Sequence, residues 1–363
     1  MHVFFRTDAS LVIGHGHVMR CLTLAAALRE DGITCVFVCR EHQGHLCQFI
    51  EDRGFTLVRL PLADSPPSRE ATPVHSAWLG ATWAEDAAQT REAISRAGVR
   101  PGWMIVDHYA LDSRWESTLR PHVARIMAID DIADRTHDAD VLLDQNFYPD
   151  MDARYSSRVG PGCNRLLGPR YALLRNEFSG LRKTSRVRRG PVRRVMVFFG
   201  GSDVTNETGK ALDAMALLGM PEVEFEVVIG NTNPNKDVLV SRCDGLSKVR
   251  LYCQVANMAE MMVRSDLAIG AAGTATWERC ALGLPALMLA VADNQVAIAE
   301  GVDQVGAQRY LGESSVVSAA ALALAMSQVI RSPQLLAGMS QKAMNLVDAL
   351  GAARVATALK EFA

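Results

Sequence analysis

Gly14-His15-Gly16-His17-Val18-Met19-Arg20 joins an opening strand to a helix and is the segment of this sequence that says most about its fold. The apolar run Val3-Phe4-Phe5 predicts a buried strand, and apolar residues recur at helical spacing after the turn as far as Leu28. Two glycines at such a turn let a ligand approach the backbone closely, and the start of the helix offers unpaired N–H groups and a positive dipole end. Histidine is the side chain best suited to proton transfer near neutral pH. The stretch therefore predicts chemistry on a phosphorylated small molecule.

The composition is typical of a two-domain α/β protein. A chain of 363 residues with 49% hydrophobic content is long enough for two cores. Its net charge of −2 gives no general reason to expect a nucleic acid or a membrane surface as partner. The eight cysteines lie mostly in apolar runs, which favours reduced thiols. We find no signal peptide and no apolar run of transmembrane length, so we expect a cytoplasmic protein.

Strand-like runs alternate with helical patterns in two series. The expected strands are residues 3–6, 34–39, 56–59, 103–107, 125–130 and 141–143, and then 195–199, 224–229, 249–252, 267–269, 286–289 and 308–310. Such alternation predicts parallel, doubly wound sheets. We expect two Rossmann-like domains, 1–180 and 195–363, that face a central cleft and are joined by a basic, solvated linker at 181–194.

The opening turn has three other interpretations. A dinucleotide-binding fingerprint fails, because Met19 stands where its third glycine should be. A metal site is conceivable, since His15 and His17 form a His-x-His pair and Asp107-His108 and Asp130-Asp131 follow later strands. A helix N-terminus repels a cation, which disfavours that site. His17 could also simply cap the turn.

The second half contains further candidate loops at strand ends. Gly200-Gly201-Ser202-Asp203 follows one strand, and Gly273-Thr274 begins a helix that carries Glu278 one turn later. Small residues and a hydroxyl at a helix start suit a diphosphate, and a carboxylate there can accept hydrogen bonds from a sugar diol. Glu278 could instead be a plain first-turn acid in a tight turn. Asn294-Gln295 adds amides that can bind hydroxyl or amide groups.

The N-terminal motif resembles one known family. The run Arg6-x-Asp8-x-Ser10-x-x-Ile13-Gly14-x-Gly16-His17-Val18-Met19-Arg20-Cys21-Leu22 is similar to the first motif of the UDP-sugar hydrolases of pseudaminic acid biosynthesis, the PseG family. Further segments resemble that family in order: Asp107-His108-Tyr109, Gly168-Pro169-Arg170-Tyr171-Ala172-Leu173-Leu174-Arg175, Gly200-Gly201-Ser202-Asp203 and the segment from Gly273 to Glu278. More distantly, both halves resemble GT-B glycosyltransferases that act on UDP-N-acetylglucosamine.

The resemblance implies a GT-B fold and a metal-independent hydrolase that needs no cofactor. The implied substrate is UDP-2,4-diacetamido-2,4,6-trideoxy-β-L-altropyranose, which water would attack at C1 with inversion, releasing UDP. That reaction would serve pseudaminic acid biosynthesis and flagellin glycosylation. The alternative is a GT-B glycosyltransferase that uses a UDP-N-acetylhexosamine donor. We expect a monomer whose partner is the UDP-sugar, with no nucleic acid and no membrane.

The resemblance also implies roles for single residues. His17 matches the general base, and Asp8 is expected to orient its imidazole. Tyr109, Asn294 and Gln295 are expected to contact the sugar. The remaining substrate-binding residues are Gly273 and Thr274 for the diphosphate, Glu278 for the ribose, and Gly14, Gly16, Arg20, Gly200, Gly201 and Ser202.

Overall fold

Strand β1 (His2–Thr7) lies in the middle of a parallel sheet and is buried on both faces, as its apolar run predicts. Its alternate side chains enter two different cores. Phe5 packs in one core, where its ring stacks on Phe37 at 4.9 Å, and Phe4 packs in the other with Met104. Helices cover both faces of this sheet, since the first core includes apolar residues of α1 (Gly16–Glu30) and the second includes those of α3 (Trp83–Ala97) and α4 (Ser113–Leu119).

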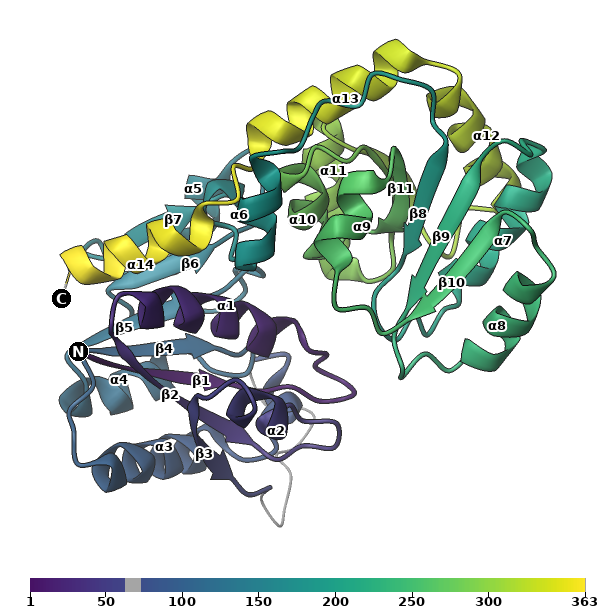
Figure 1. Ribbon diagram of the computed structural model, residues 1–363. Coiled ribbons are helices and arrows are strands. Elements are labelled where there is room, and N and C mark those ends of the chain that lie inside the picture. Colours follow the sequence, from purple (N-terminus) through teal and green to yellow (C-terminus); the bar gives the residue numbers. More distant parts are fainter. Residues whose placement is uncertain (63–72, 363) are drawn as a thin grey trace. The chain divides into compact units, whose positions relative to one another are not determined.

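The computed structural model describes residues 1–62 and 73–362, which divide into two units (Figure 1). Unit 1 comprises Met1–Asn146, Asp150–Leu174 and Leu350–Ala363, and unit 2 comprises Phe147–Pro149 and Arg175–Ala349. Residues 63–72 and 363 belong to the expected domains but lie outside the described residues.

Unit 1 is built on a seven-stranded parallel sheet of order β3-β2-β1-β4-β5-β6-β7. Its other strands are β2 (Thr34–Arg40), β3 (Thr56–Leu60), β4 (Trp103–Asp107), β5 (Arg125–Ile129), β6 (Val141–Asp144) and β7 (Asn164–Leu167). Its helices are α1 (Gly16–Glu30), α2 (Cys47–Glu51), η1 (Ser76–Leu79), α3 (Trp83–Ala97), α4 (Ser113–Leu119), η2 (Arg120–His122), α5 (Met151–Tyr155), η3 (Pro169–Tyr171) and α14 (Gly351–Glu361). Strand β7 was not expected from the sequence. It is a short edge strand in which Leu166 alone is buried, so its residues carry no apolar run.

Unit 2 repeats the architecture with a six-stranded parallel sheet of order β10-β9-β8-β11-β12-β13. Its strands are β8 (Arg194–Phe198), β9 (Glu224–Ile229), β10 (Val249–Cys253), β11 (Leu267–Ala271), β12 (Ala286–Ala290) and β13 (Arg309–Glu313). Its helices are α6 (Asn176–Arg182), α7 (Glu207–Leu218), α8 (Lys236–Asp244), α9 (Met258–Arg264), α10 (Ala275–Ala281), η4 (Asp293–Gln295), α11 (Val296–Gln304), α12 (Ala319–Ile330) and α13 (Pro333–Leu346). The expected α/β class with two doubly wound parallel sheets is confirmed.

The division of the chain differs from the expected boundaries at its C-terminal end. Helix α14 belongs to unit 1 and not to the second domain, where the expected range of 195–363 placed it (Figure 1). Val355 and Leu359 of α14 are buried in the unit 1 core, and Trp103 Nε1 of β4 donates to the Leu359 carbonyl at 3.0 Å. The apolar face of a helix is visible in a sequence, but which core it covers is decided only by tertiary packing.

The basic segment at 181–194 also differs from the expected solvated linker. Arg188 is only 6% exposed, and its guanidinium donates hydrogen bonds to the backbone carbonyls of Met262 (2.9 Å), Ser265 (3.2 Å) and Leu282. Burial lowers the pKa of Arg188 to about 10. The neighbouring Arg189 is exposed. The segment is therefore anchored in unit 2 by one of its arginines.

Within residues 1–62 and 73–362, every helix is too short or too polar to cross a membrane.

Candidate active site

The strand order of each sheet reverses direction at one point. In unit 1 the chain fills the sheet outward from β1 to β3 and then from β4 to β7, so β1 and β4 are neighbours. Thr7 at the end of β1 pairs with Asp107 at the end of β4. Ligands of such sheets bind outside the carboxyl ends of the strands at this switch point. A ligand site is therefore expected at the loops that follow Thr7 and Asp107.

The loop after β1 positions His17 at this edge of the sheet. The Ser10 hydroxyl closes the loop by accepting hydrogen bonds from two of its backbone N–H groups, at 2.9 and 3.1 Å. Gly14 has a φ of 78°, which disfavours any residue with a Cβ. A Cβ on Gly14 or Gly16 would meet no described atom within 4 Å, so the backbone is open at both glycines. Helix α1 begins at Gly16, which places His17 in its first turn with 7% of its surface exposed.

His17 forms a close pair with the carboxylate at the end of β4. Its Nδ1 lies 2.6 Å from Asp107 Oδ1. Burial by itself would raise the pKa of Asp107, but attraction to Arg20 and His17 and the hydrogen bonds that they donate hold that pKa well below its usual value. An ionised carboxylate can only accept hydrogen bonds, so Nδ1 must carry a proton. In the neutral imidazole this leaves Nε2 as a proton acceptor.

Arg20, one turn further along α1, also binds the Asp107 carboxylate. Its Nε lies 2.6 Å from Asp107 Oδ2 and its Nη2 lies 2.7 Å from Oδ1, which is a bidentate pair. Its Nη1 donates to Asp131 Oδ2 at 2.8 Å. The sequence predicts Arg20 as a substrate-binding residue, whereas the structure places its buried guanidinium between two carboxylates of the chain itself.

Tyr109 contacts both Asp131 and His17. Its hydroxyl donates to Asp131 Oδ1, and its ring stands edge-on to His17 with centroids 4.6 Å apart. Burial and then the charge of Asp131 raise the pKa of Tyr109 well above its usual value, so the phenol stays protonated. His75 and Trp78 pack beside Tyr109, with ring centroids 5.5 and 5.9 Å from its own. Sequence reasoning missed these two aromatic residues, because no periodicity marks the loop region that carries them.

The expected role of Asp8 is wrong, because Asp107 and not Asp8 contacts the His17 imidazole. Asp8 accepts hydrogen bonds from Arg6 Nη1 and from the backbone N of Arg40, both at 2.6 Å. His108 Nε2 lies 3.3 Å from its other oxygen. Burial opposes the ionisation of Asp8, but Arg6 and the nearby histidines hold its pKa well below the usual value. Asp8 therefore ties the ends of β1 and β2 together. The signal for Asp107 was present in the sequence as an acid that ends an apolar strand.

The switch point of unit 2 lies between β8 and β11. The expected residues Gly200, Gly201 and Ser202 lie in the loop after β8, one residue beyond its end. The Gly201 carbonyl accepts a hydrogen bond from Gly230 N at 3.1 Å, and a Cβ on Gly230 would lie 2.4 Å from that carbonyl oxygen. Asp203 accepts hydrogen bonds at 2.9 Å from two backbone N–H groups at the start of α7. The loop after β8 is thus held by backbone contacts on one side and by a helix cap on the other.

The loop after β11 brings together two more of the expected residues. Gly273 and Thr274 lie between β11 and α10. The side-chain amide nitrogen of Gln295 lies 3.5 Å from the position that a Cβ on Gly273 would occupy, while Gln295 Oε1 accepts a hydrogen bond from Val291 N at 3.1 Å. Asn294 is exposed in η4 beside it.

Glu278 and its neighbour Arg279 lie on α10, directly after this loop. Glu278 is half-buried, and its Oε1 lies 3.4 Å from Arg175 Nη2. Burial raises the pKa of Glu278, and Arg175 opposes that rise. Arg279 is 2% exposed and donates to the Ala271 carbonyl, at the end of β11, at 2.9 Å. Burial lowers the pKa of Arg279 to about 10. Sequence reasoning did not select this buried cation below the loop.

His15 and His17, the pair considered as metal ligands, do not point to a common site. His17 is buried against Asp107, whereas His15 is exposed at the start of α1. Among the residues that the structure describes, no group of three or more His, Cys, Asp or Glu side chains is arranged to hold a metal ion.

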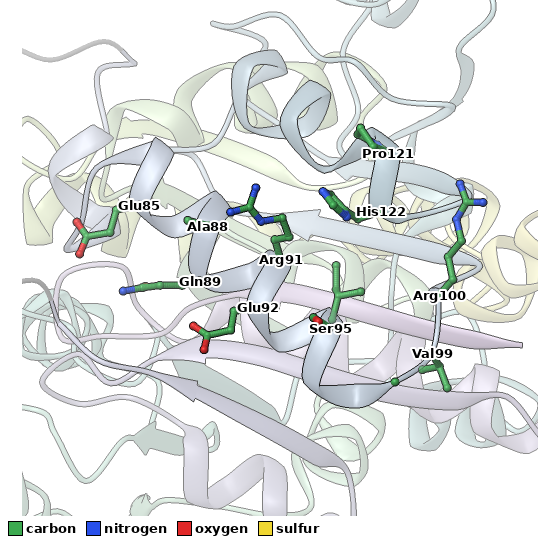
Figure 2. A pocket seen from close by; sticks show the side chains of 12 residues that line it. Glu85, Ala88, Gln89, Arg91, Glu92, Ser95, Val99, Arg100, Pro121 and His122 are labelled. Carbon is green, nitrogen blue, oxygen red and sulfur yellow. The ribbon is translucent and has the colours of Figure 1, made fainter.

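A cavity of about 840 Å³ lies elsewhere in unit 1. Figure 2 shows that its lining comes from one face of α3, including Glu85, Gln89 and Glu92, together with Pro121 and His122. None of the site residues described above lines it. The cavity is therefore separate from the carboxyl ends of β1 and β4, near which His17 and Asp107 lie.

No family model matches the chain. The chain is 24% identical over 295 residues to the uncharacterized protein MJ1062 of Methanocaldococcus jannaschii, covering 80% of the chain and 55% of that protein. It is 27% identical over 195 residues to the spore coat polysaccharide biosynthesis protein SpsG of Bacillus subtilis, covering 53% of the chain and 57% of SpsG. These matches thus span little more than half the length of either relative. A UDP-2,4-diacetamido-2,4,6-trideoxy-β-L-altropyranose hydrolase of Campylobacter jejuni is 24% identical over 268 residues, 73% of the chain and 83% of that enzyme.

The fold is shared with solved structures over 99% of the chain. MurG of Acinetobacter baumannii has a TM-score of 0.67 at 14% identity, with 99% of its chain covered. UGT71G1 of Medicago truncatula, solved with UDP-glucose, has a TM-score of 0.66 at 12% identity, with 98% covered. A putative UDP-N-acetylglucosamine 2-epimerase of Listeria monocytogenes has a TM-score of 0.62 at 13% identity, with 96% covered. The two parallel-sheet units of this chain therefore form a GT-B fold.

Proposed function

We propose that the protein hydrolyses a UDP-sugar, with His17 as the general base. One observation carries this proposal: Asp107 Oδ1 holds His17 Nδ1 at 2.6 Å and so leaves Nε2 to accept a proton. The pair stands at the switch point of unit 1, where ligands of such sheets bind. An imidazole oriented in this way can take a proton from a water molecule.

In the proposed reaction, a water oxygen forms a bond to C1 of the sugar on the face opposite the nucleotide. The bond between C1 and the diphosphate oxygen breaks, and UDP leaves with the electron pair. The proton of the water passes to Nε2 of His17, and the free sugar is released with inverted configuration at C1. Because a nucleoside diphosphate is a good leaving group, the reaction needs a base for the water more than a strong acid, and no metal ion is required.

The loops of unit 2 are proposed to bind the nucleotide. Gly273 and Thr274 would hold the diphosphate, and Glu278 would hold the ribose. Gly200, Gly201 and Ser202 are assigned to the same substrate. Their positions support this assignment, because both loops follow the two strands that flank the switch point of unit 2. The buried Arg279, which donates to the carbonyl at the end of β11, adds positive charge below the loop that is proposed to hold an anion.

The proposed substrate is UDP-2,4-diacetamido-2,4,6-trideoxy-β-L-altropyranose. The similarity to the Campylobacter jejuni hydrolase supports it, as does the N-terminal motif that ends in Gly16-His17-Val18-Met19-Arg20. Asn294 and Gln295 carry amide groups that can pair with the acetamido substituents of such a sugar.

A GT-B glycosyltransferase is the second candidate. The fold shared with MurG and with the plant enzyme solved with UDP-glucose supports it. In that case a sugar or another hydroxyl compound, rather than water, would give its proton to His17. The two candidates differ in whether UDP is released when no acceptor is present.

The test is to incubate the protein with the UDP-trideoxy sugar and EDTA in ¹⁸O-labelled water. Equal amounts of UDP and free sugar, with the label on the sugar, are the expected result. Label on the phosphate would exclude attack at C1, and release that requires a divalent metal would overturn the metal-free mechanism. Release only after an acceptor is added, with no label in the product, would establish the glycosyltransferase instead.

The variant His17→Asn provides the matching control. It should lose turnover by about 10²-fold or more while it retains its affinity for UDP, as expected when a general base is removed. An equal loss of UDP affinity would assign the imidazole to ligand binding instead of to proton transfer.

A further inference from the structure

We propose that Arg20 and Asp131 are positioning residues that act through Asp107 and set how readily the His17 imidazole takes up a proton. This inference rests on the function proposed above, since it concerns the strength of the base in that reaction. It is carried by the geometry of five side chains: two from α1, one from the end of β4, and one each from the loops after β4 and β5.

The contact between Arg20 and His17 is repulsive. Arg20 Nη2 lies 3.2 Å from His17 Nδ1, a distance at which the two atoms could share a hydrogen bond. However, Nδ1 lies much closer to Asp107 Oδ1, at 2.6 Å, and a carboxylate can only accept. Nδ1 therefore carries a proton, and a guanidinium nitrogen has only protons to offer. Two donors face each other, so the positive charge of Arg20 opposes the formation of an imidazolium.

Asp131 offsets that charge from the far side of the guanidinium. Its Oδ2 accepts a hydrogen bond from Arg20 Nη1 at 2.8 Å, and its Oδ1 accepts one from the Tyr109 hydroxyl. Tyr109 in turn places its ring edge-on against His17. The contacts therefore close a ring from His17 through Asp107, Arg20, Asp131 and Tyr109 back to His17. The Arg20 guanidinium is thus shared between the carboxylates of Asp107 and Asp131.

Other titratable groups also face His17 and are held constant in the test. Asp107 and His108 approach from the end of β4, and Tyr109 comes from the loop after it. His75, which precedes η1, contacts the Tyr109 ring, and Arg135 lies over that ring with its Cζ 5.6 Å from the ring centroid. All of these groups remain in place when only Arg20 or Asp131 is changed.

Replacing Arg20 and replacing Asp131 should shift the titration midpoint of His17 in opposite directions. Loss of the Arg20 charge favours the imidazolium, so His17 should titrate at higher pH in Arg20→Met. Loss of the Asp131 charge leaves Arg20 less compensated, so His17 should titrate at lower pH in Asp131→Asn. Each shift should be on the order of one pH unit, as expected for a unit charge several ångströms away in a partly buried site. A merely structural role for the pair would not produce shifts of opposite sign.

The experiment follows the His17 ring by NMR in the full-length protein, with the signal assigned by its loss in His17→Asn. The titration midpoint is measured in the wild type, Arg20→Met and Asp131→Asn. Tyr109→Phe is the third variant, because it keeps both charges and removes only the hydroxyl, so its midpoint should move less than either. The matched control is Arg96→Met, which removes an exposed arginine paired with Glu92 on α3.

The acidic limb of kcat/KM for UDP release should move in the same direction as each midpoint, because the reaction needs the unprotonated imidazole. Midpoints that do not move, or that move in the same direction in both charge variants, would overturn the inference. If the wild type releases no UDP while the midpoints move in opposite directions, the proposed function fails and the coupling of Arg20 and Asp131 to His17 stands.

Discussion

His17 Nδ1 and Asp107 Oδ1 lie 2.6 Å apart although 90 positions separate the two residues in the chain. They meet because β1 and β4 are neighbours in the unit 1 sheet, with Thr7 in register with Asp107. One residue follows the first strand and the other ends the fourth, so the parallel topology brings both to the same edge. The pair determines which imidazole nitrogen carries the proton, and the proposed chemistry depends on that choice.

Replacing Asp107 by Asn should strongly lower turnover, because it removes the carboxylate charge that His17 and Arg20 both contact. The amide can turn its NH₂ group toward His17, which favours the tautomer with Nε2 protonated, and such a ring cannot accept a proton from water. We expect turnover to fall by about 10²- to 10⁴-fold with little change in UDP affinity. Steady-state kinetics and UDP titration measure the two effects.

Asp213→Asn is the matched control for that variant. Asp213 is an exposed aspartate that pairs with Arg242 in unit 2. It should leave turnover within about twofold, since an exposed ion pair contributes little. Full activity in Asp107→Asn would show that the carboxylate does not select the tautomer.

Replacing Arg188 by Met should destabilise unit 2. The change leaves the buried carbonyls of Met262, Ser265 and Leu282 without the donors that the guanidinium supplies. We expect a loss of about 2–4 kcal/mol in the free energy of unfolding, measured by urea denaturation. Arg189→Met, at the exposed neighbouring position, should change it by less than about 0.5 kcal/mol. Equal effects of the two variants would contradict the anchoring role of Arg188.

Replacing Gly230 by Ala should disturb the loop after β8. A Cβ at this position would lie 2.4 Å from the Gly201 carbonyl oxygen, so the backbone of the loop must move. We expect weaker UDP binding and a loss of about 1–3 kcal/mol in stability. Gly245→Ala is the control, since a Cβ there meets no described atom within 4 Å. Unchanged UDP affinity in a folded Gly230→Ala protein would argue against a role of this loop in nucleotide binding.

The stability of unit 1 should depend on pH through His137. Burial lowers the pKa of His137, but Glu116 and Asp130 more than offset this and raise it to about 9 from the usual 6.5. Because the folded state binds the proton more tightly, the stabilisation is complete below pH 6.5 and is lost as the pH rises through 9. The advantage of the wild type over His137→Gln should shrink by about 3 kcal/mol between pH 6 and pH 9.5. A difference in unfolding free energy that is the same at both pH values would contradict this assignment.

The α/β class, the positions of most strands and the glycine-rich turn that carries His17 can all be predicted from the amino-acid sequence. These features are local, since an apolar run of strand length, a helical period and a glycine at positive φ such as Gly14 each depend on a few neighbouring residues. Strand β7 was not predicted, because this edge strand buries few side chains and carries no apolar run.

The carboxylate that contacts His17 could not be predicted without the three-dimensional structure. Asp8 is near in sequence and Asp107 is distant, yet Asp8 pairs with Arg6 while Asp107 reaches the imidazole. The same holds for helix α14, whose apolar face covers unit 1, and for Arg188, which is buried within a basic segment. In each case the choice depends on strand order and on which surfaces remain uncovered. These are properties of the assembled sheets and not of any stretch of residues.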